Sequence, residues 1–136
     1  MKEASIHMIA LQPTAHSVRS ARQFASGLLD HHETGVRETV VLLVSELVSN
    51  AVQHGGPHGS TETVGLEVEA RPESVLVKVT DSGDGELRPG NGAIDHRSGR
   101  GLLLVESLSS RWGCDRLDYG KTVWFEIDTS PGGPDG

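Results

Sequence analysis

The sequence contains few aromatic residues, one cysteine and no long apolar segment. Aromatic residues make up only 4% of the chain, so a hydrophobic core must consist mainly of valine, leucine and isoleucine. Because Cys114 is the only cysteine, an intrachain disulfide and a cysteine-rich zinc site are both excluded. Because the chain has no long apolar segment, the sequence predicts neither a signal peptide nor a membrane span, and we expect a cytoplasmic domain.

The sequence also has fewer basic residues than acidic residues. The 136 residues include 12 Lys and Arg but 19 Asp and Glu, which gives a formal net charge of −7. Such a chain has no general attraction for phosphate backbones or anionic lipid, so we expect no direct binding to nucleic acid or to a membrane. A local cluster of arginines can still form a pocket for one small anion. The length predicts a single domain over residues 1–128, followed by a disordered tail over 129–136.

Hydrophobic periodicity predicts the order of helices and strands. The predicted strands are 6–11, 64–70, 74–81, 114–119 and 121–128, and the predicted helices are 14–32, 36–54 and 101–112. Thr14 is the expected N-cap of the first helix, and Trp124 is expected to pack on the sheet. Since the strands and helices do not alternate strictly, we predict an α+β fold with an antiparallel or mixed sheet and its helices on one face.

The second predicted helix carries a line of polar residues. Glu46, Asn50 and His54 follow one another at i, i+4 and i+8, so a helix stacks them on one face. The opposite face carries the spacing of a core stripe, with Val40, Val44, Leu47, Val48 and Ala51. Taken alone, such a line is more often a solvated surface than a site.

A glycine-rich stretch, residues 82–100, lies between two short patterns. Asp81-Ser-Gly83-Asp-Gly85 begins at the end of a predicted strand, and Gly99-Arg100-Gly101 opens a predicted helix. Each pattern alone also describes an ordinary turn or a flexible loop end. A loop of this length in a compact domain is usually functional or disordered.

The order of these patterns favours a nucleotide site. A carboxylate at a strand end accepts a hydrogen bond from an amino group such as the exocyclic amine of adenine. Glycines at a helix start leave N–H groups free for phosphate oxygens, and the loop between can close over the ligand. Mg²⁺ on a nucleotide takes few protein ligands, which suits Asn50, and Glu46 one turn earlier suits activation of a nucleophile.

Four patterns in this order resemble those of a known superfamily. They are Glu46-x-x-x-Asn50-Ala51, Asp81-x-Gly83-x-Gly85, Gly99-x-Gly101 and Gly120-Lys121-Thr122. They resemble the N, G1, G2 and G3 boxes of the GHKL ATPase superfamily. The short length, the absence of a dimerisation or phosphoacceptor helix pair, and the segments GRGLLLVESLSSRWG and GKTVWFEI resemble its anti-sigma-factor serine/threonine kinase branch. The resemblance covers about residues 11–128.

This resemblance implies a Bergerat-type two-layer α/β sandwich, with a mixed, mostly antiparallel sheet, that binds ATP and Mg²⁺. By position, Asn50 would ligate Mg²⁺, and Asp81 would bind the adenine amine with support from Thr122. The pocket and lid would be shaped by Gly83, Gly85, Gly99 and Gly101. Glu46 would be the general base. For His54 and Arg100, contact with phosphate oxygens and simple solvation are both open.

The resemblance further implies a kinase that phosphorylates a serine or threonine of an anti-anti-sigma factor, sequesters a sigma factor and forms a homodimer. Arg19 and Arg22 share a face of the first helix, where they either meet an acidic partner or are solvated. The alternative function is a non-catalytic ATP-binding module whose nucleotide state sets partner affinity. A histidine kinase catalytic domain is a weaker alternative, because the phosphoacceptor helices are missing.

Overall fold

The computed structural model describes residues 4–54, 63–81, 96–118 and 120–129. In chain order the elements are β1 (Ser5–Leu11), α1 (His16–Leu28), α2 (Thr34–His54), β2 (Val64–Ala70), β3 (Ser74–Asp81), α3 (His96–Leu108), β4 (Arg111–Leu117) and β5 (Gly120–Asp128). Of the predicted tail only Thr129 is described, and its N–H donates to the carbonyl of Glu73 at 2.9 Å.

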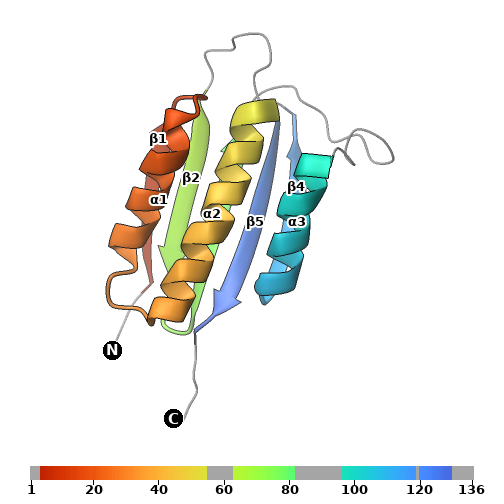
Figure 1. The fold of residues 1–136 in the computed structure, drawn as a ribbon. Coiled ribbons are helices and arrows are strands. Elements are labelled where there is room, and N and C mark those ends of the chain that lie inside the picture. The colour runs from red at the N-terminus through yellow and green to blue at the C-terminus, as the bar shows by residue number, and fades with distance from the viewer. Residues whose placement is uncertain (1–3, 55–62, 82–95, 119, 130–136) are drawn as a thin grey trace.

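The strands form one five-stranded sheet in the order β1-β2-β3-β5-β4. Every neighbouring pair is antiparallel, so the sheet is antiparallel throughout and not mixed as the resemblance implied. All three helices cover the same face of the sheet, with α2 between α1 and α3 (Figure 1). The predicted α+β class with helices on one face is confirmed.

Valines and leucines fill the space between the two layers. On β3, alternate residues Val75, Val77 and Val79 face the helices and are buried. They meet the apolar stripe of α2, whose buried members are Val40, Leu43, Val44, Leu47, Val48 and Ala51. Phe125 is the one fully buried aromatic side chain among the described residues. The core thus has the aliphatic composition that the scarcity of aromatic residues predicted.

The start of α1 differs from the prediction. The helix begins at His16, Ala15 occupies the N-cap position, and no side chain caps the helix. The Ser17 N–H donates to the Thr14 carbonyl at 2.9 Å, so a tighter turn precedes the first helical residue. The buried Ser17 hydroxyl donates to the carbonyl of Gln12 at 2.5 Å. Thr14 was therefore wrong as the N-cap, because Ser17 makes the local side-chain bond to the backbone.

The boundary between α3 and β4 also differs. The prediction placed Arg111 and Trp112 at the end of a helix, but the helix ends at Leu108 and both residues belong to β4. The hydroxyl of Ser109 donates to the carbonyl of Val105 at 2.6 Å, and the next N–H pairs with β5. Trp112 then pairs with Phe125 and packs against the core. Burial of this side chain on the sheet outweighs its compatibility with the helical pattern.

Trp124 packs on the open face of the sheet, as predicted. It pairs with Gly113 of β4, and a Cβ added at Gly113 would lie 2.7 Å from the Trp124 Nε1 atom. The indole ring therefore covers the backbone of Gly113 more closely than any side chain there would allow. Glycine is required at this position by close approach.

Candidate functional site

The end of β3 and the start of β5 form a buried ion pair. Asp81 and Lys121 face each other across these strands, and Lys121 Nζ lies 2.8 Å from Asp81 Oδ2. The Asp81 side chain is 4% exposed and that of Lys121 is 15% exposed. Neither group has full access to water, so breaking this ion pair would leave a buried charge without a partner.

The other oxygen of this carboxylate is left without a partner. Asp81 Oδ1 is buried and accepts no hydrogen bond from any residue that the structure describes. An unsatisfied buried oxygen costs free energy, so native proteins rarely keep one. Since Asp81 follows the core-facing residues of β3 by the alternation of the strand, this oxygen lies on the helix side of the sheet. This oxygen is therefore placed to accept a hydrogen bond from a donor outside the described residues.

Thr122 does not support Asp81. Its hydroxyl lies 2.8 Å from that of Thr80, its partner across the two strands. Neighbouring residues of a strand point to opposite faces, so Thr80 and Thr122 lie on the face away from Asp81. The expected contact was wrong by one position, and Lys121 makes it. The strand register decides this, and period-two alternation counted back from Val123, which packs against the core, would have placed Lys121 on the same face as Asp81.

The polar line on α2 lies beside the core stripe. Glu46 and Asn50 are partly buried and one helical turn apart. On its flank toward α1, α2 presents Val41 and Ser45, and its helical geometry directs Glu46 and Asn50 to the flank away from α1. The second half of α2, the first turn of α3 and the start of β5 lie at the same end of the molecule (Figure 1). Asp81, paired with Lys121, lies there too.

The remaining expected site residues are described in part or not at all. Gly83 and Gly85 lie outside the described residues. His54 ends α2, and only its backbone is described. The helix α3 begins at His96, so the prediction that Gly99-Arg100-Gly101 opens it was wrong, and this segment lies inside its first two turns. The free N–H groups of α3 therefore belong to residues before Gly101.

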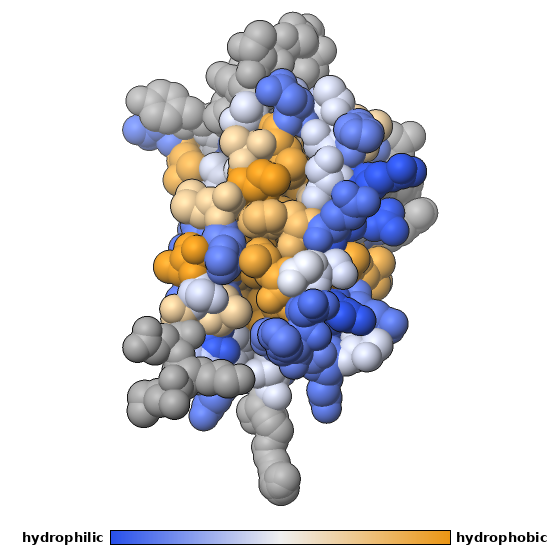
Figure 2. Space-filling view, turned by 90° about the vertical axis from the view of Figure 1, so that its left-hand side faces the viewer, coloured by the Kyte–Doolittle hydropathy of each residue, from blue (hydrophilic) through white to orange (hydrophobic). Residues whose placement is uncertain are grey.

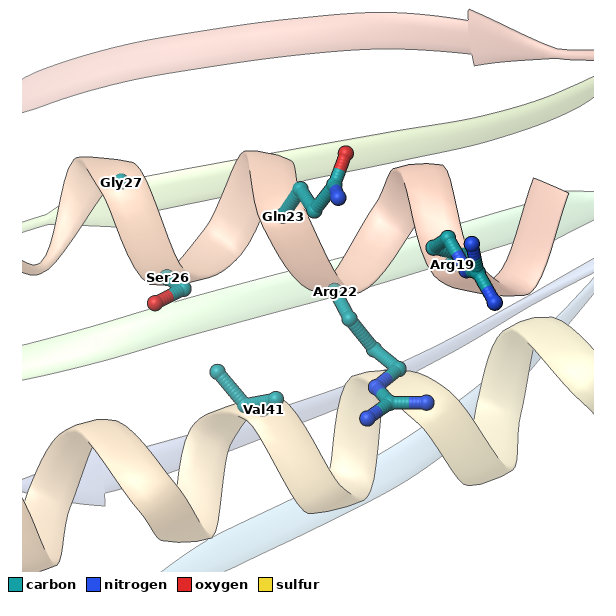
Figure 3. Close-up of a pocket in the computed structure, with 6 residues that line it drawn as sticks. All are labelled: Arg19, Arg22, Gln23, Ser26, Gly27 and Val41. Carbon is teal, nitrogen blue, oxygen red and sulfur yellow. The ribbon is translucent and has the colours of Figure 1, made fainter.

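A groove separates α1 from α2 on the outer surface of the helical layer. Its larger part has a volume of about 660 Å³ and is lined by Arg19, Arg22, Gln23, Ser26, Gly27 and Val41. Figure 3 shows the Arg22 side chain reaching across toward α2. An adjoining hollow of about 560 Å³ includes Arg22 and Arg37, and Arg37 also lies 3.6 Å from Asp30. Arg19 and Arg22 do share one face, as predicted, and this groove is distinct from the Glu46 and Asn50 flank.

Two further properties of the described residues concern metal binding and membrane insertion. No group of three or more His, Cys, Asp or Glu side chains among these residues is placed to hold a metal ion. None of the described helices has the length and apolar character to cross a membrane.

Comparison with known proteins identifies the family of the chain and solved structures with a similar fold. The family model of the histidine kinase-like ATPase domain matches residues 11–127. The crystal structure of the RsbU and RsbW domains of Rv1364c from Mycobacterium tuberculosis has a similar fold, with a TM-score of 0.72 and 21% sequence identity. The match covers 93% of this chain but only 33% of that one, so this chain spans about a third of its structural relative. No curated protein matches the sequence significantly.

Proposed function

The chain belongs to the family of histidine kinase-like ATPase domains, and from this premise we propose that it is an ATP-dependent serine/threonine protein kinase. Its proposed substrate is an anti-anti-sigma factor, and its second proposed partner is a sigma factor that it sequesters. The observation that carries the nucleotide part of the proposal is the buried Asp81 carboxylate with one free oxygen. That oxygen fits the exocyclic amine of adenine, which is a hydrogen-bond donor.

The phosphate end of the proposed site lies along α2. Asn50 would hold Mg²⁺ through its side-chain oxygen, and the bound ion supplies charge neutralisation on the phosphates. Glu46 lies one turn earlier, where its carboxylate can accept the proton of an attacking serine or threonine hydroxyl. A partly buried carboxylate that forms no ion pair with a described residue is available for this role. The backbone of α3 near Gly99, together with Gly83, Gly85 and Arg100, completes the proposed nucleotide contacts.

The proposed protein partners meet a different surface. The groove between α1 and α2 presents Arg19 and Arg22 together, on a chain whose net charge is otherwise negative (Figure 3). An acidic segment of a sigma factor or of its antagonist fits such a groove by charge. The RsbW domain named in the structural relative supports the choice of partner class by analogy of fold.

We also propose that two copies of the chain pair along β1. This edge strand contains no charged residue and no proline, whereas the opposite edge, β4, carries Arg111, Asp115 and Arg116. Charges and proline are the usual protection of an exposed edge against pairing. Ile6 and Met8 of this strand are 55% and 71% exposed. Figure 2 shows an apolar strip on this side of the molecule. A second β1 strand would extend the sheet without placing like charges opposite each other.

Single-turnover phosphoryl transfer tests the proposal. The purified chain would be mixed with radiolabelled ATP, Mg²⁺ and candidate anti-anti-sigma proteins, and the labelled residue would be mapped. Label on a serine or threonine of one candidate supports the kinase. ATP binding without transfer to any candidate favours the non-catalytic module. Binding of the same candidates by the double variant Arg19→Glu, Arg22→Glu reports separately on the groove, because these residues lie away from the nucleotide contacts.

A further inference from the structure

The Asp81–Lys121 pair offers a hydrogen-bond acceptor and a hydrogen-bond donor side by side. Lys121 has three N–H groups, and Asp81 is its one hydrogen-bond partner among the described residues. Asp81 in turn uses Oδ2 for Lys121 and keeps Oδ1 free. Both side chains lie on the helix side of the sheet and are largely shielded from water. A ligand that reaches Asp81 Oδ1 therefore comes within reach of the ammonium group as well.

The Watson–Crick edge of adenine has the complementary pattern. Its 6-amine donates a hydrogen bond, and the adjacent ring nitrogen N1 accepts one. Guanine reverses both groups, with a carbonyl at position 6 and an N–H at position 1. An acceptor and a donor fixed next to each other therefore discriminate between the two bases on two counts, and a mismatched edge leaves buried groups unpaired.

We infer that Lys121 is a base-reading residue, which donates a hydrogen bond to N1 of adenine while Asp81 accepts one from the 6-amine. This inference rests on the proposed function, since it concerns the same nucleotide site. It differs from a purely structural role, in which Lys121 only neutralises the buried carboxylate. In that case the lysine would affect the stability of the chain and ATP affinity, but not the preference for a nucleotide that carries N1.

Calorimetry with two ATP analogues separates the roles of the two residues. In 1-deaza-ATP the N1 atom is replaced by C–H, and in purine riboside triphosphate the 6-amine is absent. The unmodified chain should bind 1-deaza-ATP about ten- to a hundred-fold more weakly than ATP, as expected for the loss of a hydrogen bond to a charged group. It should lose a similar factor with purine riboside triphosphate.

Lys121→Met keeps an unbranched side chain of similar length and removes the donor. This variant should bind ATP and 1-deaza-ATP with equal affinity, while it still discriminates against purine riboside triphosphate. Lys78→Met is the matched control. Lys78 lies on β3 opposite Trp124, on the other face of the sheet, so its removal should leave every nucleotide preference unchanged.

The outcomes are distinct. Equal binding of ATP and 1-deaza-ATP by the unmodified chain overturns the inference and leaves the proposed function standing, and this arm does not depend on the folding of any variant. Retained discrimination by a folded Lys121→Met variant overturns it too. If the unmodified chain binds no ATP, the proposed function fails, and the inference fails with it.

Discussion

Asp81 is the residue on which the proposed nucleotide site chiefly depends. It ends β3, it is buried, and only one of its two oxygens has a partner among the described residues. A strand-end carboxylate of this kind is stable in the free protein because Lys121 balances its charge. In the proposed site, its free oxygen would accept a hydrogen bond from the adenine amine without any rearrangement of the sheet.

Asp81→Asn should weaken ATP binding by about ten- to a hundred-fold. An amide has one oxygen where the carboxylate has two, so it cannot serve both Lys121 and the adenine amine. Isothermal titration calorimetry with ATP and Mg²⁺ measures the change, and thermal unfolding shows whether the variant remains folded. Unchanged ATP affinity in a folded variant would remove Asp81 from the adenine site.

Glu46→Gln tests the proposed chemistry. Glutamine keeps the shape of the side chain and loses its basicity. Because Glu46 is assigned to proton transfer and not to the base or the metal, ATP affinity should remain nearly intact. Phosphorylation of the partner should slow by about a hundred- to ten-thousand-fold, the usual contribution of a positioned general base.

The measurement is single-turnover transfer of radiolabelled phosphate to the partner, beside nucleotide binding by the same protein. The variant should still capture its partner and hold it. Equal transfer rates for both proteins would show that another group, or the substrate itself, handles the proton.

At the scale of elements, the strands next to the core were the easiest to predict. The predicted strands 64–70 and 74–81 coincide with β2 and β3, because their alternation of apolar and polar residues reflects one buried and one open face. The boundary near Trp112 was missed, since a tryptophan fits a helical pattern and a strand equally well. Its place on β4 depends on pairing with Phe125 of the next strand, which a helical pattern read within residues 101–112 does not include.

The same limit explains what was missed in the site. The sequence showed a carboxylate and a late Gly-Lys-Thr segment, but the pairing of Asp81 with Lys121 is a matter of register between two strands. A shift of one residue exchanges the faces of the sheet, so the residue types alone do not distinguish Thr122 from Lys121, whereas alternation counted back from Val123 does. The free oxygen of Asp81 likewise depends on which described side chains surround it in three dimensions.

The β4–β5 hairpin gives a prediction at this scale. Gly113→Ala would place a methyl group 2.7–2.8 Å from three atoms of the Trp124 ring, closer than real carbon atoms approach. The ring must move, and overpacking of this kind costs about 1–3 kcal/mol. Thermal unfolding should therefore show a lower Tm, with a change in tryptophan fluorescence.

Gly27→Ala is the matched control for that substitution. Gly27 lies exposed in α1 with no atom within 4 Å of an added Cβ. Alanine is the better helix former by up to about 1 kcal/mol, so this variant should be as stable as the parent or more stable. A Gly113→Ala variant that unfolds at the parental Tm would contradict the close packing of Trp124.

At the scale of the whole molecule, a polar cluster ties the ends of several strands together far from the proposed site. Glu126 of β5 accepts hydrogen bonds from Ser74 at 2.6 Å, from Arg71 at 3.0 Å and from Arg111 at 3.1 Å. The hydrogen bond from Ser74 and then that from Arg111 lower the pKa of Glu126 from its ordinary value of 4.5. The pKa values of both arginines are raised, so these side chains stay charged throughout the acid range.

This cluster predicts how stability depends on pH. Because the pKa of Glu126 is lower in the folded chain, its contribution is complete above the unfolded value and is lost as the pH falls through the folded value. Glu126→Gln should lower the free energy of unfolding at pH 7 by about 1–3 kcal/mol, as expected for lost hydrogen bonds to a charged group. The difference from the parent should shrink below pH 4.5. Urea unfolding at several pH values measures both, and a difference that does not change with pH would contradict this role.

Assembly through β1 depends on the residue at the centre of this strand. If two copies pair along β1 about a two-fold axis at its centre, Met8 of each copy lies opposite Met8 of the other, since it is the middle residue of Ser5–Leu11. Met8→Lys then places two like charges directly across the new strand pair, which is unfavourable in a sheet. The dissociation constant of the dimer, measured by sedimentation equilibrium, should rise by at least about tenfold.

Leu117→Lys is the matched control, because Leu117 is also exposed and lies on β4 at the other edge. This control should dimerise like the parent, because β4 already carries charges that prevent pairing. A monomeric parent, or a Met8→Lys variant that dimerises as tightly as the parent, would exclude β1 as the interface.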